Sequence, residues 1–119
     1  MTERQAFGRA SEKRAENFLR TKKHRILKKN YRTRQGEVDI VSLSPEGILV
    51  FTEVRSKHDC RYGHPVETVD ARKQARVRAA ARQFLYEHAK YRDFACRFDV
   101  ITVVGEGRDA LLEYFPDAF

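Results

Sequence analysis

The sequence lacks any long apolar run. No stretch of about 18 apolar residues, the length that crosses a membrane, occurs in the 119 residues. Residues 1–5 also lack the apolar core of a secretory signal. These two absences predict a cytoplasmic protein that makes no membrane contact.

Cysteine is scarce as well. The chain has 2 cysteines, Cys60 and Cys96, which lie far apart and form no CxxC pair. This spacing argues against a disulfide framework and against a thioredoxin-like site. Internal repeats and low-complexity segments are also missing. Because 119 residues suffice for one core and not for two, we expect a single domain over residues 1–119.

Positive charge, in contrast, is abundant. Lys and Arg number 24 against 17 Asp and Glu, which gives a formal net charge of +7. An excess of this kind favours polyanionic partners, nucleic acid above all, because binding releases condensed counterions. A basic surface that only keeps the protein in solution is the alternative, and charge alone leaves both open.

The apolar pattern predicts the element order α-β-β-β-α-β-β. Helical spacing occurs over about residues 4–21 and 69–88, and Thr68 or Asp70 can cap the second helix. Strands are expected over about residues 24–31, 37–43, 48–55, 97–104 and 111–115, with a loop over residues 56–65. The β-α-β portion predicts a parallel crossover and therefore an α/β fold, a mixed β-sheet flanked by helices.

Two acidic residues, Asp39 and Glu53, interrupt the apolar strands of the expected hairpin. A carboxylate in such a strand is costly unless it is paired or bound to a metal. If residues 45–47 form a three-residue turn, the ladder places Asp39 directly opposite Glu53, with Cβ atoms roughly 5 Å apart. Two carboxylates at that separation repel each other unless a cation lies between them or one is protonated.

This pair predicts a site for Mg²⁺ or Mn²⁺, which prefer oxygen ligands. Such a metal activates water and polarises a phosphate, the two tasks of phosphodiester hydrolysis. By alternation Arg55 and Lys57 share a face with Glu53, where a cation would stabilise negative charge on the phosphate. The alternative is a strand face stabilised by cross-strand ion pairs.

The second expected helix is strongly basic. A helix that is merely solvated usually mixes charge signs, because opposite charges four residues apart attract each other. This helix has five cations without one intervening acid, and we expect them to contact phosphates: Arg72, Lys73, Arg76, Arg78 and Arg82.

Two further acids have more than one interpretation. Glu12 lies at the margin of the apolar arc of the first helix, so it either faces a site or pairs with neighbouring cations in solvent. Asp99, in the strand near residues 97–104, either supports the site or pairs with Arg97, and we favour the structural interpretation.

The order of several short motifs resembles the bacterial YraN family, which is similar in fold to restriction endonucleases and archaeal Holliday junction resolvases. The resemblance covers nearly the full chain. It rests on Gly8, Glu12, Ala15, Phe18 and Leu19, residues 36–41, residues 51–55, Tyr62 and Gly63, Lys73, residues 97–101 and residues 116–119.

The resemblance implies a restriction-endonuclease-like core in which a helix Glu, a strand Asp and an acid-x-Lys strand assemble a metal site. Glu12, Asp39 and Glu53 match those acids. The chain departs from the pattern at Arg55, where the family usually has Lys, and at Lys57, where it often has Arg. With a pKa above about 12, Arg can stabilise an oxyanion but cannot act as a general base.

We therefore expect a divalent-metal-dependent nuclease or junction-resolving enzyme, with DNA favoured over RNA. Turnover is expected to need Lys57 or Lys73 at the site, although Lys57 lies two residues, roughly 6 to 7 Å, beyond Arg55. The alternatives are a noncatalytic nucleic-acid-binding or scaffold protein that retains the fold, and a protein-interaction module. A junction resolver would need two sites and hence a symmetric homodimer.

Overall fold

The computed structural model describes residues 2–58 and 69–119. Within these ranges the elements follow the order α-β-β-β-α-β-β that the sequence predicts, with a short 3₁₀ turn on each side of the fourth strand. Their bounds are α1 Glu3–Thr21, β1 Arg25–Arg32, β2 Glu37–Leu43, β3 Leu49–Lys57, α2 Ala71–Glu87, η2 Ala89–Tyr91, β4 Cys96–Val104, η3 Gly107–Asp109 and β5 Leu111–Phe115.

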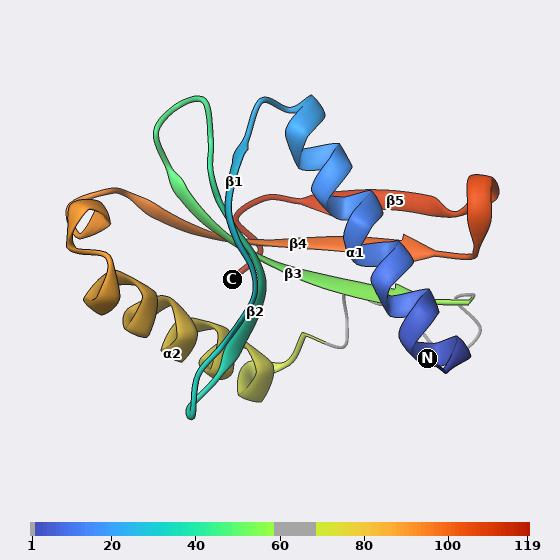
Figure 1. Cartoon of the computed structure of the whole chain (residues 1–119), viewed down its shortest axis with the longest axis horizontal. Helices are drawn as coiled ribbons and strands as arrows, with labels where there is room; N and C mark the ends of the chain where they lie inside the picture. Colours follow the sequence, from blue (N-terminus) through green and yellow to red (C-terminus); the bar gives the residue numbers. More distant parts are fainter. Residues whose placement is uncertain (1, 59–68) are drawn as a thin grey trace.

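The strands form one five-stranded mixed sheet in the order β1-β2-β3-β4-β5. β3 and β4 pair in parallel through the α2 crossover, whereas the other neighbours are antiparallel. This confirms the expected α/β fold, a mixed sheet flanked by helices. Figure 1 shows the β1–β2 ribbon crossing steeply over the direction of β3, β4 and β5. The sheet is therefore strongly twisted between β2 and β3.

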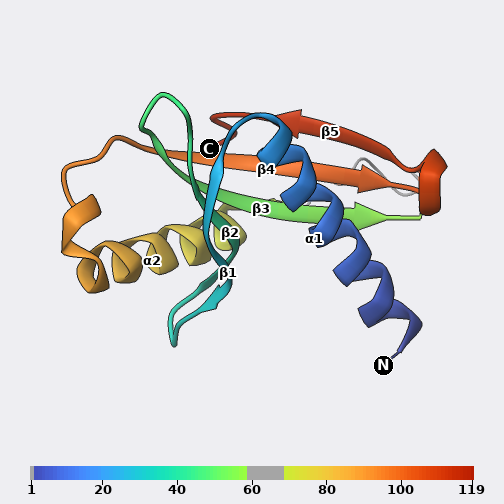
Figure 2. The same cartoon turned by 45° about the horizontal axis from the view of Figure 1, so that its top comes forward.

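The two helices cover opposite faces of the sheet. α1 places Ala15 and Leu19 against a cluster that includes Ile40, whereas α2 places Val77 and Phe84 against a cluster that includes Val41. Neighbouring residues of a strand point to opposite faces, so these two clusters lie on different sides. Figures 1 and 2 show the helices separated by the strands.

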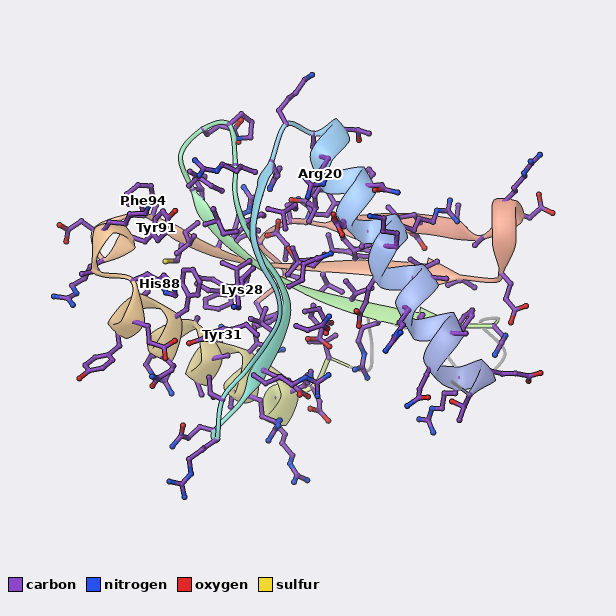
Figure 3. The ribbon with its side chains drawn as sticks, in the orientation of Figure 1. Arg20, Lys28, Tyr31, His88, Tyr91 and Phe94 are labelled. Carbon is purple, nitrogen blue, oxygen red and sulfur yellow. The ribbon has the colours of Figure 1, made fainter. Side chains whose placement is uncertain are left out.

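An aromatic cluster fixes the end of α2 against β1. The Phe84 ring centroid lies 5.5 Å from that of Tyr31, 4.1 Å from His88 and 6.1 Å from Tyr91. The Tyr31 hydroxyl also donates a hydrogen bond to Glu87. Figure 3 labels Tyr31 on β1 and His88 at the end of α2, the two residues whose rings contact Phe84. These contacts set the position of α2 relative to the β1–β2 ribbon.

The limits of α2 and β3 differ slightly from expectation. Asp70 caps α2 by accepting a hydrogen bond from the Lys73 backbone nitrogen at 2.9 Å, and Thr68, the other predicted cap, lies outside the described residues. The prediction that the loop begins at residue 56 is wrong, because β3 continues to Lys57 through its pairing with β4. Residues 59–65 of that expected loop also lie outside the described residues. No helix in the described ranges is both long and apolar enough to cross a membrane.

Candidate active site

The β2–β3 hairpin has the register that the sequence predicts. Ile40 pairs with Thr52 and Val41 with Phe51, so Asp39 and Glu53 occupy the next pair of positions along the ladder. The turn closes through a hydrogen bond of 2.9 Å from the Gly47 nitrogen to the Ser44 carbonyl, and Gly47 has a φ of 85°. A left-handed residue at this point is what brings the two acids into line.

Asp39 lies where the regular pairing of β2 with β3 ends. Its Oδ2 accepts a hydrogen bond of 2.7 Å from the backbone nitrogen of Val54. Burial raises the pKa of the Asp39 carboxyl above its usual value, and the Val54 hydrogen bond opposes this shift. The side chain thus replaces a strand carbonyl as the acceptor for β3.

Glu53 is the more deeply buried acid of the pair, with a relative exposure of 2%. Its Oε1 lies 3.5 Å from Lys73 Nζ and 3.6 Å from Arg55 Nη1. Its Oε2 is buried and hydrogen-bonds to none of the described residues. Burial, together with the negative charge of Asp39, raises the pKa of Glu53 to about 8. In its protonated form Glu53 hydrogen-bonds to the Asp39 side chain, whereas its Oε2 is buried without a partner among the described residues.

Lys73 reaches this pair from the first turn of α2. Its side chain is largely buried, and its Nζ lies 3.2 Å from Oε1 of Glu37 as well as close to Glu53. Lys73 was predicted as a phosphate contact and as one of two lysines able to reach the acids. The structure therefore places an ammonium group beside Glu53, although the strand position two residues on holds Arg55.

Glu37 is a site residue that the sequence analysis missed. It bridges Lys73 to Arg76, whose Nη2 lies 3.9 Å from Glu37 Oε1, and these cations hold the pKa of Glu37 below its usual value. The signal was present in the alternation of β2, because Glu37 lies two residues before Asp39 on a strand of period two.

Glu12 lies close to Asp39 and belongs to α1, the helix on the other face of the sheet from α2. Burial and the charge of Asp39 raise the pKa of Glu12, which is half-buried on α1. Both acids line a shallow pocket of about 280 Å³, together with Asn30 and Lys29. Glu12 thus lies on the α1 side of Asp39, whereas Glu53 meets Lys73 on the α2 side.

Lys57 is placed apart from the acid pair. It ends β3, four positions beyond Glu53, and lines a larger groove between α1 and the ends of β3 and β4. Arg55, in contrast, contacts Glu53 directly. Arg55 and Lys57 thus line the same groove, but only Arg55 is within ion-pair distance of Glu53 among the contacts of the described residues.

The basic residues of α2 do not form one continuous face. Arg78 lies over the rings of Phe98 and Phe119, at 5.4 and 5.3 Å from their centroids. Lys73 and Arg76 instead reach the acids of β2 and β3. At 100° per residue, positions 72 to 82 spread around both flanks of the buried stripe, which explains the division. Arg72 and Arg82 are exposed.

Asp99 belongs to a separate buried network. It is fully buried and bonds Arg97 through both carboxylate oxygens, at 2.9 and 3.0 Å. It also accepts hydrogen bonds from the Tyr114 hydroxyl and from the Asp117 backbone nitrogen. Its contacts are therefore those of a structural ion pair, as favoured from the sequence.

The donor set of the candidate site suits a hard cation. Asp39 and Glu53 offer carboxylate oxygens, and the buried Oε2 of Glu53 lacks a hydrogen-bond donor among the described residues. Over residues 2–58 and 69–119, no cluster of three or more His, Cys, Asp or Glu side chains is arranged for a metal. Mg²⁺ is commonly held by one or two carboxylates and keeps several waters, so two acids are sufficient for it.

A comparison with known proteins identifies the family. Residues 11–103 match the model of the uncharacterised protein family UPF0102. The chain belongs to this family. The resemblance to the YraN family is confirmed, since both names denote the same family. The matched UPF0102 range contains Glu12, Asp39, Glu53 and Lys73, so the whole candidate site lies within it.

Curated UPF0102 proteins of several bacteria are similar over most of their length. One from Desulforamulus reducens is 41% identical over 101 residues, which cover 85% of this chain and 83% of the relative. One from Deinococcus radiodurans is 41% identical, covering 83% of this chain and 80% of the relative. One from Anaeromyxobacter dehalogenans is 44% identical, covering 98% of this chain and 85% of the relative.

Proposed function

We propose that this protein is a divalent-metal-dependent nuclease that hydrolyses phosphodiester bonds in DNA. The observation that carries the proposal is the pair Asp39 and Glu53 with Lys73 beside it. A purely structural acid pair would be expected to saturate its oxygens, but the buried Oε2 of Glu53 meets no donor among the described residues.

Asp39 and Glu53 would hold Mg²⁺ or Mn²⁺, and Glu12 would assist from the α1 side. When bound, the metal supplies Lewis-acid polarisation of a phosphate oxygen and a water of lowered pKa. The acids themselves orient the site: Asp39 is held by its bond to Val54, and Glu53 is fixed by burial between β3 and α2. Fixed ligands need no reorganisation during the reaction, which favours catalysis.

Lys73 would take the part of the strand lysine that Arg55 replaces. Its Nζ and the Arg55 guanidinium both lie close to Oε1 of Glu53, so a phosphate at the acid pair would meet two cations. Charge-assisted hydrogen bonds from such groups stabilise the negative charge that develops in the transition state. Lys57, which lies further along β3, would contact the substrate rather than the reacting phosphate.

The basic surface supports a nucleic-acid substrate without sequence selectivity. Arg72, Arg76 and Arg82 are exposed on α2, and Arg76 lies beside Glu37. Contacts from Arg and Lys to phosphates position a duplex but carry no base information. We therefore expect recognition of substrate shape, such as a branch or junction, and binding that weakens steeply with salt.

The test is cleavage of labelled duplex, single-stranded, flap and four-way-junction DNA with Mg²⁺ or Mn²⁺. Asp39→Asn and Glu53→Gln should abolish cleavage while binding is retained, because both variants keep the shape of the side chain. Glu46→Gln, at the exposed β2–β3 turn, is the matched control and should cleave normally. Lys73→Met should lower the rate by at least about tenfold, as expected for loss of one charge-stabilising group.

Two results would overturn the proposal. Cleavage that persists in both acid variants would show that the activity comes from another site or a contaminant. Binding without any metal-dependent product would favour the noncatalytic nucleic-acid-binding alternative, and Arg55→Lys would then show whether restoring the strand lysine restores turnover.

A further inference from the structure

A groove separates the N-terminal half of α1 from the ends of β3 and β4. It has a volume of about 1310 Å³ and is lined by residues of three segments: 3–14 of α1, 54–58 of β3 and its end, and 103–110 after β4. In Figure 1 the first turns of α1 lie beside the ends of these strands. Arg55 lines this groove and also lies 3.6 Å from Oε1 of Glu53, so the groove reaches the acid pair through the Arg55 side chain.

Four of the groove-lining side chains are permanent cations: Arg4, Arg14, Arg55 and Lys57. The most informative is Arg14, whose Nη1 is buried and hydrogen-bonds to none of the described residues. A buried guanidinium nitrogen without an acceptor is unfavourable, so its position indicates an acceptor that the described residues do not provide. A phosphate oxygen is the acceptor that a guanidinium group binds best.

Two acids also line the groove. Glu106 Oε1 lies 2.7 Å from Nδ1 of His58, and Glu3 lies in the first turn of α1. Against these two acids stand the four permanent cations. The net charge of the lining is thus positive and complements a phosphodiester backbone.

An aromatic pair adds a second recognition element. The rings of Phe7 and His58 stack with centroids 4.4 Å apart and an interplanar angle of 15°. Both residues line the groove, and the His58 side chain is 70% exposed. Aromatic faces beside cations are typical of sites for unpaired bases, because a base within a duplex is already stacked and cannot use them.

We propose that this groove binds an unpaired nucleic-acid strand and leads it past the Asp39 and Glu53 pair. Arg14 and Arg4 bind successive phosphates, and the stack of Phe7 on His58 receives a base. The inference deepens the proposed function and rests on it for the direction of the strand toward the acids. It gives the substrate class as branched DNA with a single-stranded arm.

Binding of a fluorescent single-stranded oligonucleotide, followed by anisotropy without metal, tests the groove separately from cleavage. Arg14→Gln should weaken binding by about tenfold and reduce the slope of log affinity against log salt by about 0.7, the value for one lost contact to a single strand. Arg4→Gln, at an exposed position, should act in the same direction and does not depend on the packing of Arg14. Phe7→Leu should weaken binding several-fold with the salt slope unchanged.

Arg92→Gln is the matched control. Arg92 is exposed and follows η2 at the other end of the molecule, so its loss should leave binding of the oligonucleotide nearly unchanged. Circular dichroism of each variant checks that the fold is retained. If Arg14→Gln unfolds, the affinities of Arg4→Gln and Phe7→Leu show whether the groove binds the oligonucleotide.

The outcomes separate the two proposals. If the variants Arg14→Gln, Arg4→Gln and Phe7→Leu bind and cleave flap DNA like the wild type, the proposal that the groove binds a strand is wrong, even if Asp39→Asn abolishes cleavage. Weakened binding in the groove variants, with no cleavage by the wild type, would support the strand site and overturn the nuclease. Equal losses of oligonucleotide affinity in Arg92→Gln and Arg14→Gln would also contradict strand binding in the groove, because they would show that affinity depends on net charge alone.

Discussion

Two buried acids on neighbouring strands have opposite surroundings. Asp99 of β4 is bonded by Arg97, Tyr114 and a backbone nitrogen, so all its charge is matched. Glu53 of β3 is equally buried but lies beside another acid, with one oxygen lacking a donor among the described residues. Burial alone therefore does not distinguish Asp99 from the candidate site acid Glu53. The two differ in the number of hydrogen-bond donors that the described residues provide.

The largest expected effect is the loss of stability when the Asp99 carboxylate is removed. Asp99→Ala removes the carboxylate that accepts hydrogen bonds from Arg97 and from the Tyr114 hydroxyl, so we expect a loss of about 3 to 5 kcal/mol in the free energy of unfolding. Urea unfolding followed by far-ultraviolet circular dichroism measures it. A loss below about 1 kcal/mol would contradict the view of Asp99 as a structural ion-pair member.

The next effect concerns how α2 is held close to Glu53. A Cβ atom on Gly36 would lie 1.8 Å from the carbonyl oxygen of Arg76, so Gly36→Ala must push the β1–β2 turn away from α2. We expect a loss of about 3 kcal/mol, at the upper end for overpacking, together with weaker contact between Lys73 and Glu53. Urea unfolding and DNA cleavage measure the two effects.

Gly8→Ala is the control for Gly36→Ala. A Cβ atom on Gly8 meets nothing within 4 Å, and the residue lies inside α1. Alanine should therefore stabilise the protein by up to about 1 kcal/mol. Similar stability changes for both variants would contradict the close approach of the turn to α2.

Replacing Glu53 should have a moderate effect of the opposite sign, a gain in stability. Its pKa rises from 4.5 in the unfolded chain to about 8 in the folded protein, so the folded state favours the protonated form. Stability is therefore lost as pH rises from about 4.5 toward 8, and Glu53→Gln should avoid this loss. We expect the metal-free variant to be about 1 to 3 kcal/mol more stable near pH 8 and nearly equal to the wild type near pH 4.

Urea unfolding of both proteins across this pH range measures the difference. A variant that is less stable than the wild type at pH 8 would show that Glu53 is matched like Asp99. The comparison between the two acids would then fail.

The smallest expected effect is stabilisation by a metal. At a concentration ten times the dissociation constant, Mg²⁺ should add about 1.4 kcal/mol, or roughly 5 °C in melting temperature for a domain of this size. Glu46→Gln should show the same shift, and Asp39→Asn should show none. Differential scanning fluorimetry with Mg²⁺ and with Mn²⁺ makes the comparison. An equal shift in Asp39→Asn would place the metal elsewhere.

The sequence predicted those features that depend on local spacing. Turn residues 45–47 determined the hairpin register and so the meeting of Asp39 with Glu53. The spacing of apolar residues predicted the order of elements along the chain, and the β-α-β portion predicted the parallel crossover. These features follow from periods of two and 3.6 residues, which are visible in one chain.

Contacts between elements could not be obtained in the same way. Lys73 reaches Glu53 because the close approach of Gly36 to Arg76 and the aromatic cluster around Phe84 set the position of α2. Arg78 instead lies over two rings from distant parts of the chain. Which cations of a helix reach an acid depends on its rotation and depth, and no local pattern specifies them.

The Asp39 carboxylate combines two separable roles: it accepts the hydrogen bond from Val54, and in the proposed site it holds a metal. One oxygen continues the ladder of β3 as a carbonyl would, and this duty needs an acceptor but no charge. Asparagine could perform it equally well. A descendant of this protein could therefore exchange Asp for Asn at position 39 and keep its architecture. Under the proposed function, that exchange would end the metal chemistry while leaving the fold unchanged.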